Sequence, residues 1–136
     1  MEIQKESYII SDDAVRLQPE RVCEMLSSTY WAKDHSRETV LASIKNSLCL
    51  GVYVGDEQVG FARCVTDYAT FFWLADVIID PAHRGQGLGK ALVEAVTTHD
   101  KLAGTRGLLA TRDAHGLYRQ YGFEPVGENL YMTKVF

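Results

Sequence analysis

The sequence has no long hydrophobic run. None of its apolar stretches reaches the roughly 18 residues that a membrane-spanning helix needs. The first residues, M-E-I-Q-K-E, also lack the apolar core of a secretory signal peptide. We therefore expect a cytoplasmic protein with no membrane partner.

Cysteine is scarce and odd in number, which argues against a disulfide framework. The three cysteines, Cys23, Cys49 and Cys64, are far apart, and each lies in an apolar pattern. This spacing is typical of reduced thiols in a core and not of a zinc site. The sequence thus predicts no bound metal.

Positive charge is not in excess either. The formal net charge is −4, from 14 Lys and Arg against 18 Asp and Glu. Because nucleic-acid binders carry basic surfaces, we expect no nucleic-acid partner. The chain has 136 residues, no internal repeat and no low-complexity linker, so residues 1–136 are expected to form a single domain.

The hydrophobic pattern predicts a mixture of strands and helices. Pro19 suits a first helical position, and Ser36 suits a helix N-cap. The apolar run at 71–79 predicts a central strand, and the helix after it makes the next strand parallel. The expected fold class is α/β (α+β), a mixed sheet of about six to seven strands flanked by about four helices. The expected strands are 8–10, 50–54, 58–66, 71–79, 108–111, 123–126 and 130–136, and the expected helices are 19–30, 36–48, 88–102 and 113–122, the last with Asp113 as N-cap.

Residues 80–90, D-P-A-H-R-G-Q-G-L-G-K, are the most informative stretch. They follow an apolar strand and begin a helix, so their glycines let backbone N–H groups approach a ligand at a helix N-terminus. Such a turn binds phosphate. Two other glycine motifs do not fit, because Ala91 stands where a P-loop needs Ser or Thr, and Leu109 stands where a dinucleotide fold needs an acidic residue.

Two further features call for a partner or a function. Asp76 interrupts the apolar strand, and it is either a catalytic base or a structural carboxylate that accepts hydrogen bonds from a loop or pairs with Arg63. Because side chains alternate along a strand, we expect Asp76 on the face opposite to Ala75. In the helix connection at 30–35, Tyr30 and Trp31 either line an acceptor pocket or only cover the helix pair.

Two motifs resemble those of the GNAT superfamily of N-acetyltransferases. The R-G-Q-G-L-G spelling at 84–89 is similar to the family's pyrophosphate-binding motif, and Y-R-Q-Y-G-F at 118–123 is similar to its tyrosine-bearing helix after the fifth strand. The order of expected elements resembles the family along almost the whole chain. The spellings L-A-D-V at 74–77 and R-D-A-H-G-L-Y at 112–118 resemble a bacterial branch. The resemblance implies a GNAT-like fold and a chemistry, but not a particular substrate.

That chemistry is an acetyl-CoA-dependent N-acetyl transfer in which an amine attacks the thioester directly. Tyr118 would protonate the departing thiolate, and Asp76 or an ordered water would accept the amine's proton. Many family members place the base carboxylate nearer Trp73 or Ala75, where this chain has none. Residues expected to hold acetyl-CoA are Val77, Ile78, Ile79, Arg84, Gly85, Gln86, Gly87, Leu88, Gly89, Lys90 and Asp113.

Two side-chain expectations accompany this assignment. On the short helix, Leu117 and Tyr121 should face the core while Tyr118 turns about 100° away toward the cleft. The Arg84 side chain should either reach a CoA phosphate or brace the loop against Asp80 or His83.

The acidic balance of the chain and its aromatic helix connection lead us to expect the primary amine of a small molecule as the acceptor. Its candidate binding residues are Tyr30, Trp31, Arg63 and Tyr68. Three alternatives stay open: a non-catalytic module that senses acyl-CoA, an acyltransferase acting on a peptide or protein amine, and the use of a longer acyl group. Homodimers are common in the family, but no exposed apolar stripe in the sequence identifies an interface.

Overall fold

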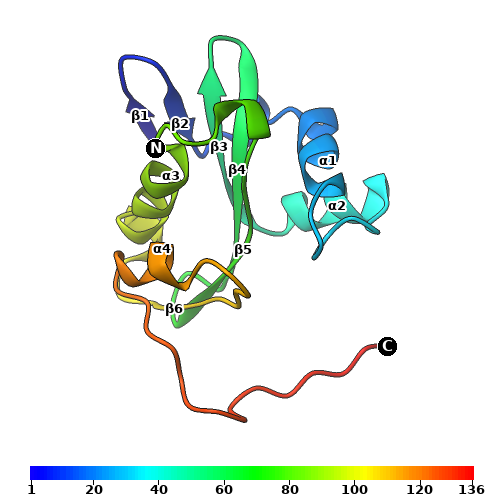
Figure 1. Cartoon of the computed structure of the whole chain (residues 1–136), viewed down its shortest axis with the longest axis vertical. Coiled ribbons are helices and arrows are strands. Elements are labelled where there is room, and N and C mark those ends of the chain that lie inside the picture. The colour runs from blue at the N-terminus through cyan, green and yellow to red at the C-terminus, as the bar shows by residue number, and fades with distance from the viewer.

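The computed structural model describes all residues, Met1–Phe136, and is organised around one six-stranded sheet with the order β1-β2-β3-β4-β5-β6 (Figure 1). Strands β1 to β5 pair antiparallel in sequence, and β6 is parallel to β5. The strands are β1 (Glu2–Gln4), β2 (Ile9–Ser11), β3 (Leu48–Val54), β4 (Glu57–Thr66), β5 (Phe71–Ile79) and β6 (Arg106–Leu108), and the α-helices are α1 (Pro19–Ser27), α2 (Arg37–Lys45), α3 (Leu88–Thr97) and α4 (His115–Arg119). The expected mixed sheet with flanking helices is confirmed.

Helices α1 and α2 cover one face of the sheet, because each presents an apolar side to it (Figure 1). Pro19 occupies the first turn of α1, and Ser36 caps α2 by accepting a hydrogen bond from the Thr39 N–H at 3.1 Å. Val22 and Met25 of α1 belong to a buried cluster with strand residues of this face.

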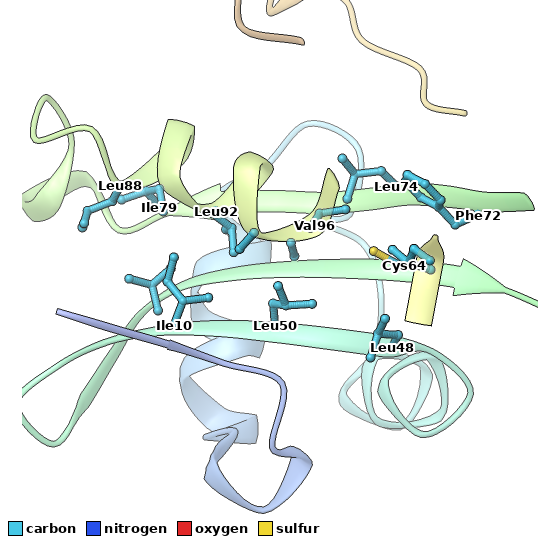
Figure 2. Packing of buried hydrophobic residues seen from close by; sticks show 14 of the residues in the cluster. Ile10, Leu48, Leu50, Cys64, Phe72, Leu74, Ile79, Leu88, Leu92 and Val96 are labelled. Atoms are coloured by element: carbon cyan, nitrogen blue, oxygen red, sulfur yellow. The ribbon is translucent and has the colours of Figure 1, made fainter. Parts of the chain in front are cut away.

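Helix α3 covers the opposite face, where the larger core lies. Figure 2 shows Leu92 and Val96 of α3 over Leu50 of β3 and Ile10 of β2. Each fully buried side chain of this kind contributes about 1.5–3 kcal/mol to folding. Strand β5 contributes to both cores, Leu74 to this one and Ile78 to the other, which explains its uninterrupted apolar sequence.

Several predicted helix ends are wrong by a few residues. Helix α1 stops at Ser27, because the Ser28 and Thr29 hydroxyls donate to carbonyls of its last turn. Helix α3 stops at Thr97, and residues 100–102 form a separate 3₁₀ turn. Helix α4 begins after Ala114, so Asp113 is not its N-cap.

The strand predictions differ from the structure at both ends of the chain. β1 was not predicted, and β6 ends before residues 109–111. The two C-terminal strands expected at 123–126 and 130–136 are absent, because no neighbouring strand supplies hydrogen bonds to this segment.

No helix is long and apolar enough to cross a membrane. The three cysteines are free thiols, and burial raises the pKa of Cys49 and of Cys64 to about 12. No group of His, Cys, Asp and Glu side chains gathers as a set of metal ligands.

Candidate functional site

A cleft opens where β5 and β6 diverge. β6 pairs with β5 only at Phe71, Phe72 and Trp73, so the later part of β5 has no strand along this edge. The cleft, about 1090 Å³, is bounded by the glycine turn, the α1–α2 connection and the segment leading into α4. The predicted site residues that it brings together are Tyr30, Trp31, Asp76, Val77, Ile78, Ile79, Arg84, Gly85, Gly87, Leu88, Gly89, Asp113 and Tyr118.

Four predicted residues do not line the cleft. Gln86 and Lys90 belong to the turn through their backbone, but their side chains are exposed. Arg63 donates a hydrogen bond to the carboxylate of Asp76, which does line the cleft. Tyr68 lies in the β4–β5 turn with φ +60° and is half exposed.

The glycine turn has a backbone shape that other residues rarely adopt. Gly85 and Gly87 have φ of +79° and +80°, and no atom lies within 4 Å of the Cβ that a larger residue would add at either position. The backbone therefore requires glycine, and open space lies in front of it. Asp80 fixes the start of the turn by accepting from the Ala82 N–H at 2.8 Å and pairing with Arg21. The Arg21 guanidinium holds the pKa of Asp80 below its usual value, which keeps the carboxylate charged.

Helix α3 begins at this turn without a side-chain cap. Gly87 is its N-cap residue and offers no oxygen to the N–H groups of the first turn, which have no intrahelical partners. Because Gly87, Leu88 and Gly89 line the cleft, these donors and the positive end of the helix dipole lie at its wall. Such an arrangement binds anions.

Arg84 braces the turn, although not through the residues expected. Its Nε donates to the Ile79 carbonyl at 3.0 Å, and neither Asp80 nor His83 is its partner. This hydrogen bond connects the end of β5 to the turn, while the Arg84 side chain also lines the cleft.

A bulge in β5 places Asp76 on a face that was not expected. Arg63 is opposite Ala75 and Phe61 is opposite Ile78, so β5 has one residue more than β4 between these pairs. Asp76 has a left-handed backbone with φ +55°. Residues directly opposite each other share a face, so Arg63 and Ala75 lie on the same face of the sheet. The Arg63 side chain donates to Asp76, so Asp76 lies on that face too. The prediction of opposite faces is wrong because it assumed a regular strand.

Both carboxylate oxygens of Asp76 are engaged. Oδ2 accepts from Arg63 Nε at 2.8 Å, and Oδ1 accepts from Trp31 Nε1 at 3.0 Å. The Asp76 residue is 8% exposed. The expected structural pairing with Arg63 is therefore present, and the Trp31 hydrogen bond ties the α1–α2 connection to the sheet.

The α1–α2 connection forms an aromatic wall of the cleft. The Tyr30 and Trp31 rings meet edge to face with centroids 4.9 Å apart. The Arg112 guanidinium stacks over Tyr30, 3.8 Å from the ring centroid. Arg112 forms no ion pair and no hydrogen bond in the chain, so its donors are free for a ligand while the stacking holds its plane. Trp31 and Trp73 line the same cleft.

Neither Arg112 nor Trp73 was predicted from the sequence as a ligand-binding side chain. A signal for Arg112 existed, because it follows the parallel strand β6, and ligands bind beyond the carboxyl ends of parallel strands. The stacking of Arg112 on Tyr30 could not be predicted from the sequence, since the two residues come from distant parts of the chain.

Tyr118 lies between the cleft and the core. Its ring packs edge to face on Phe123, with centroids 5.9 Å apart, and borders the larger hydrophobic cluster. The expected stripe of Leu117 and Tyr121 toward the core is therefore wrong: α4 is only His115–Arg119, and Tyr118 is its residue against that cluster.

The Tyr118 hydroxyl stays neutral at physiological pH. Burial, reinforced by the nearby Tyr30 and Asp113, raises the pKa of Tyr118. The hydroxyl has no hydrogen-bond partner within the chain, although Tyr118 lines the cleft. Its proton is thus available to a bound molecule.

The amino-acid sequence matches the model of one protein family. The family described as "Acetyltransferase (GNAT) domain" matches residues 45–125. FG08082 of Gibberella zeae is 32% identical over 64% of this chain and 60% of that protein. Histone acetyltransferase TAP1 of Glycine max is 38% identical over 56% of this chain and 35% of that protein. The chain thus spans less than two thirds of the length of these curated relatives.

Solved structures share the fold along nearly the whole chain. A GNAT-family protein from Xanthomonas campestris pv. campestris has a TM-score of 0.90 and 42% identity, covering 98% of this chain and 95% of that one. Glucosamine-6-phosphate N-acetyltransferase from Arabidopsis thaliana has a TM-score of 0.70 at 17% identity, and it covers 96% of this chain and 99% of that one. The second likeness concerns the fold alone.

Proposed function

Because the chain belongs to the GNAT acetyltransferase family, we propose that it transfers an acetyl group from acetyl-CoA to the primary amine of a small molecule. One observation carries the proposal: the unpaired edge of β5, the uncapped start of α3 and the Tyr118 side chain meet in a single cleft. A thioester held there would have a phosphate site at one end and a proton donor beside it.

The residues present suit acetyl-CoA as the cosubstrate. The N–H groups of the glycine turn and the dipole of α3 would hold the pyrophosphate. The backbone groups of Val77, Ile78 and Ile79 on the unpaired edge of β5, apart from the Ile79 carbonyl that accepts from Arg84, would pair with the pantetheine amides as another strand would. One N–H of this segment would stabilise the oxyanion of the tetrahedral intermediate.

The proposed transfer is a single displacement at the thioester carbonyl. The neutral amine attacks the carbonyl carbon, a C–N bond forms, and the C–S bond then breaks. Tyr118 donates its phenolic proton to the departing thiolate. Both Asp76 oxygens already accept hydrogen bonds, so we assign removal of the amine proton to water and give Asp76 the role of positioning Trp31.

Substitution of Asp76 separates these two roles. Asp76→Asn is expected to lower the free energy of unfolding by about 3 kcal/mol, because it leaves the part-buried Arg63 charge unpaired. Arg63→Gln breaks the same ion pair and should cost a similar amount. Denaturant unfolding measures the loss of stability in each variant, and kcat measures the loss of activity. A positioning role predicts similar kcat losses in both variants, whereas a loss confined to Asp76→Asn would make Asp76 the base.

The aromatic wall favours a small acceptor. Tyr30, Trp31 and Trp73 line the cleft with aromatic rings that suit an apolar group, and Arg112 offers donors to an anionic one. The acidic balance of the chain, −4, does not favour nucleic acid as a substrate. An amine on a peptide or protein is the second candidate, because TAP1 of Glycine max is named a histone acetyltransferase.

Thiol release from acetyl-CoA tests the proposal. Aminoglycosides, polyamines, free amino acids and histone-tail peptides are supplied separately, with propionyl-CoA as a second donor. Turnover with a small amine is the expected result. Turnover confined to peptides would replace the small acceptor with a protein one. Tight CoA binding without turnover on any amine would make the chain an acyl-CoA sensor.

A further inference from the structure

The Arg112 side chain joins the two sides of the cleft. Arg112 lies in the segment between β6 and α4, and Tyr118 of α4 borders the core that α3 covers. Tyr30 belongs to the α1–α2 connection, and Figure 1 shows α1 and α2 on the other side of the sheet. The guanidinium of Arg112 stacks over the Tyr30 ring, 3.8 Å from its centroid. Stacking covers one face of the guanidinium, so the N–H groups in its plane stay open to a ligand.

The other charged groups near this end of the cleft already have partners or belong to the glycine turn. Both carboxylate oxygens of Asp76 accept hydrogen bonds, and the Arg63 charge compensates its own. His83 and Arg84 belong to the glycine turn, which we assign to acetyl-CoA. No lysine lines the cleft. Arg112 is therefore an uncompensated positive charge on the acceptor side.

Asp113 does not neutralise Arg112. It follows Arg112 in the chain and lines the same cleft, but its carboxylate forms no ion pair with the guanidinium. Asp113 instead lies near Tyr118, whose pKa is raised by burial and, to a smaller extent, by Tyr30 and Asp113. The fork of donors on Arg112 thus stays unoccupied.

The floor of the cleft beside Arg112 is apolar. Leu74 faces the core under α3, so Trp73 and Ala75, its neighbours along β5, face the side of α1 and α2. Both line the cleft and are only partly buried. The Ala75 side chain is a single methyl group, so it leaves space next to the Trp73 ring. With the aromatic rings of the α1–α2 connection, this floor suits an apolar group.

We infer that the acceptor is an α-amino acid with an apolar side chain, and that the guanidinium of Arg112 binds its carboxylate. A guanidinium and a carboxylate match each other through two parallel hydrogen bonds. One uncompensated positive charge balances the single charge of a carboxylate, whereas a phosphate group brings up to two. The apolar floor and the aromatic rings would receive the side chain. This inference names the substrate class within the proposed function and rests on that function.

Tyr30 places the carboxylate site close to the proposed chemistry. Its ring lies under Arg112, and its hydroxyl is near enough to Tyr118 to affect that residue. Tyr118 is the group that we assign to the departing thiolate, so the attacking amine must come close to it. An α-amino acid carries its amine and its carboxylate on one carbon, which suits two protein groups that share a neighbour. Arg112 would then determine specificity without touching the reacting atoms.

Matched amines test the role of the carboxylate. Phenylalanine, leucine and methionine are each compared with their amides and with their decarboxylated amines, by thiol release from acetyl-CoA. Loss of the carboxylate should lower kcat/KM on the order of 10- to 100-fold, because a pair of charge-assisted hydrogen bonds is lost. The amine of an amino-acid amide is less basic and more often neutral at pH 7, so slower turnover of the amide would not come from protonation.

Arg112→Gln should remove this discrimination. Its kcat/KM for the amino acids is expected to fall to the value for the decarboxylated amines, mainly through a higher KM, since the carboxylate is bound before and during the reaction. Arg112→Lys keeps the charge but loses the fork and the planar stacking, so it should be intermediate. Arg119→Gln is the matched control, because Arg119 is also an exposed arginine and does not line the cleft. It should keep the full preference for the carboxylate.

Four results would overturn the inference. They are equal use of amino acids and their amides by the natural sequence, an undiminished carboxylate preference in Arg112→Gln, faster turnover of phosphoethanolamine than of any amino acid, and weaker CoA binding in Arg112→Gln. The last result would assign Arg112 to the cosubstrate.

Binding separates this inference from the proposed function. If no amine releases thiol, the proposed function fails, and calorimetric titration with the N-acetyl derivatives of the same compounds then decides the carboxylate site. N-acetyl amino acids should bind the natural sequence and Arg119→Gln more tightly than the N-acetylated decarboxylated amines do, and this difference should vanish in Arg112→Gln. Absence of binding, or a difference that persists in Arg112→Gln, would overturn the carboxylate site.

Discussion

Gly87→Glu is expected to abolish the binding of CoA and acetyl-CoA. The new carboxylate would lie at the start of α3, among the N–H groups that we assign to the pyrophosphate. A carboxylate about 4 Å from a phosphate charge repels it by roughly 4 kcal/mol at the dielectric of a protein surface, which weakens binding on the order of 10³-fold. The side chain would also accept hydrogen bonds from these N–H groups and so compete with the ligand.

The change at Gly87 also strains the backbone, so the experiment needs a control with the same strain. Gly87 has φ +80°, and a residue with a Cβ in this region costs about 1–3 kcal/mol. Gly55→Glu is matched, since Gly55 has φ +58°, has no atom within 4 Å of an added Cβ, and lies in the β3–β4 turn. Calorimetric titration with CoA should show binding to Gly55→Glu and none to Gly87→Glu. Equal binding by both variants would place the CoA site outside the glycine turn.

Tyr118→Phe is expected to lower kcat roughly 10²-fold or more, with little change in the affinity for acetyl-CoA. The ring packs on Phe123 and borders the core, and phenylalanine preserves that packing. The hydroxyl has no hydrogen-bond partner in the chain, so its removal leaves no protein group unsatisfied. The fall in kcat therefore measures the contribution of the proton that Tyr118 is proposed to donate to the departing thiolate.

A neighbouring tyrosine provides the control for Tyr118. Tyr121→Phe removes a hydroxyl three residues later in the chain that does not line the cleft, and its kcat should match that of the natural sequence. Because burial raises the pKa of Tyr118 above its ordinary value of 10.0, the acid form persists through the neutral range. The contribution of Tyr118 to kcat should decline only as the pH rises through that raised pKa. Full activity of Tyr118→Phe on a verified acceptor would leave Tyr118 with a packing role alone.

The sequence by itself determined the parts of this protein that depend on neighbours along the chain. The glycines at 85 and 87 predicted a turn whose backbone N–H groups can approach a ligand, and the structure gives both residues a positive φ, which glycine adopts without strain. Ser36 predicted the N-terminus of α2, because a serine hydroxyl at an N-cap accepts a hydrogen bond from an N–H three residues later. The apolar run of β5 predicted a central strand that is buried on both faces of the sheet. These signals were enough for the mixed sheet and for the turn at the start of α3.

The tertiary structure alone decided what depends on a register or on a distant partner. Asp76 lies on the face of Ala75, because a bulge opposite β4 breaks the alternation, and no local pattern marks a bulge. Arg112 meets Tyr30 across the cleft, although 30–35 and 112 belong to opposite ends of the chain. The C-terminal segment has the composition of a strand but forms none, because its backbone makes no hydrogen bonds to the sheet, and composition alone does not supply them.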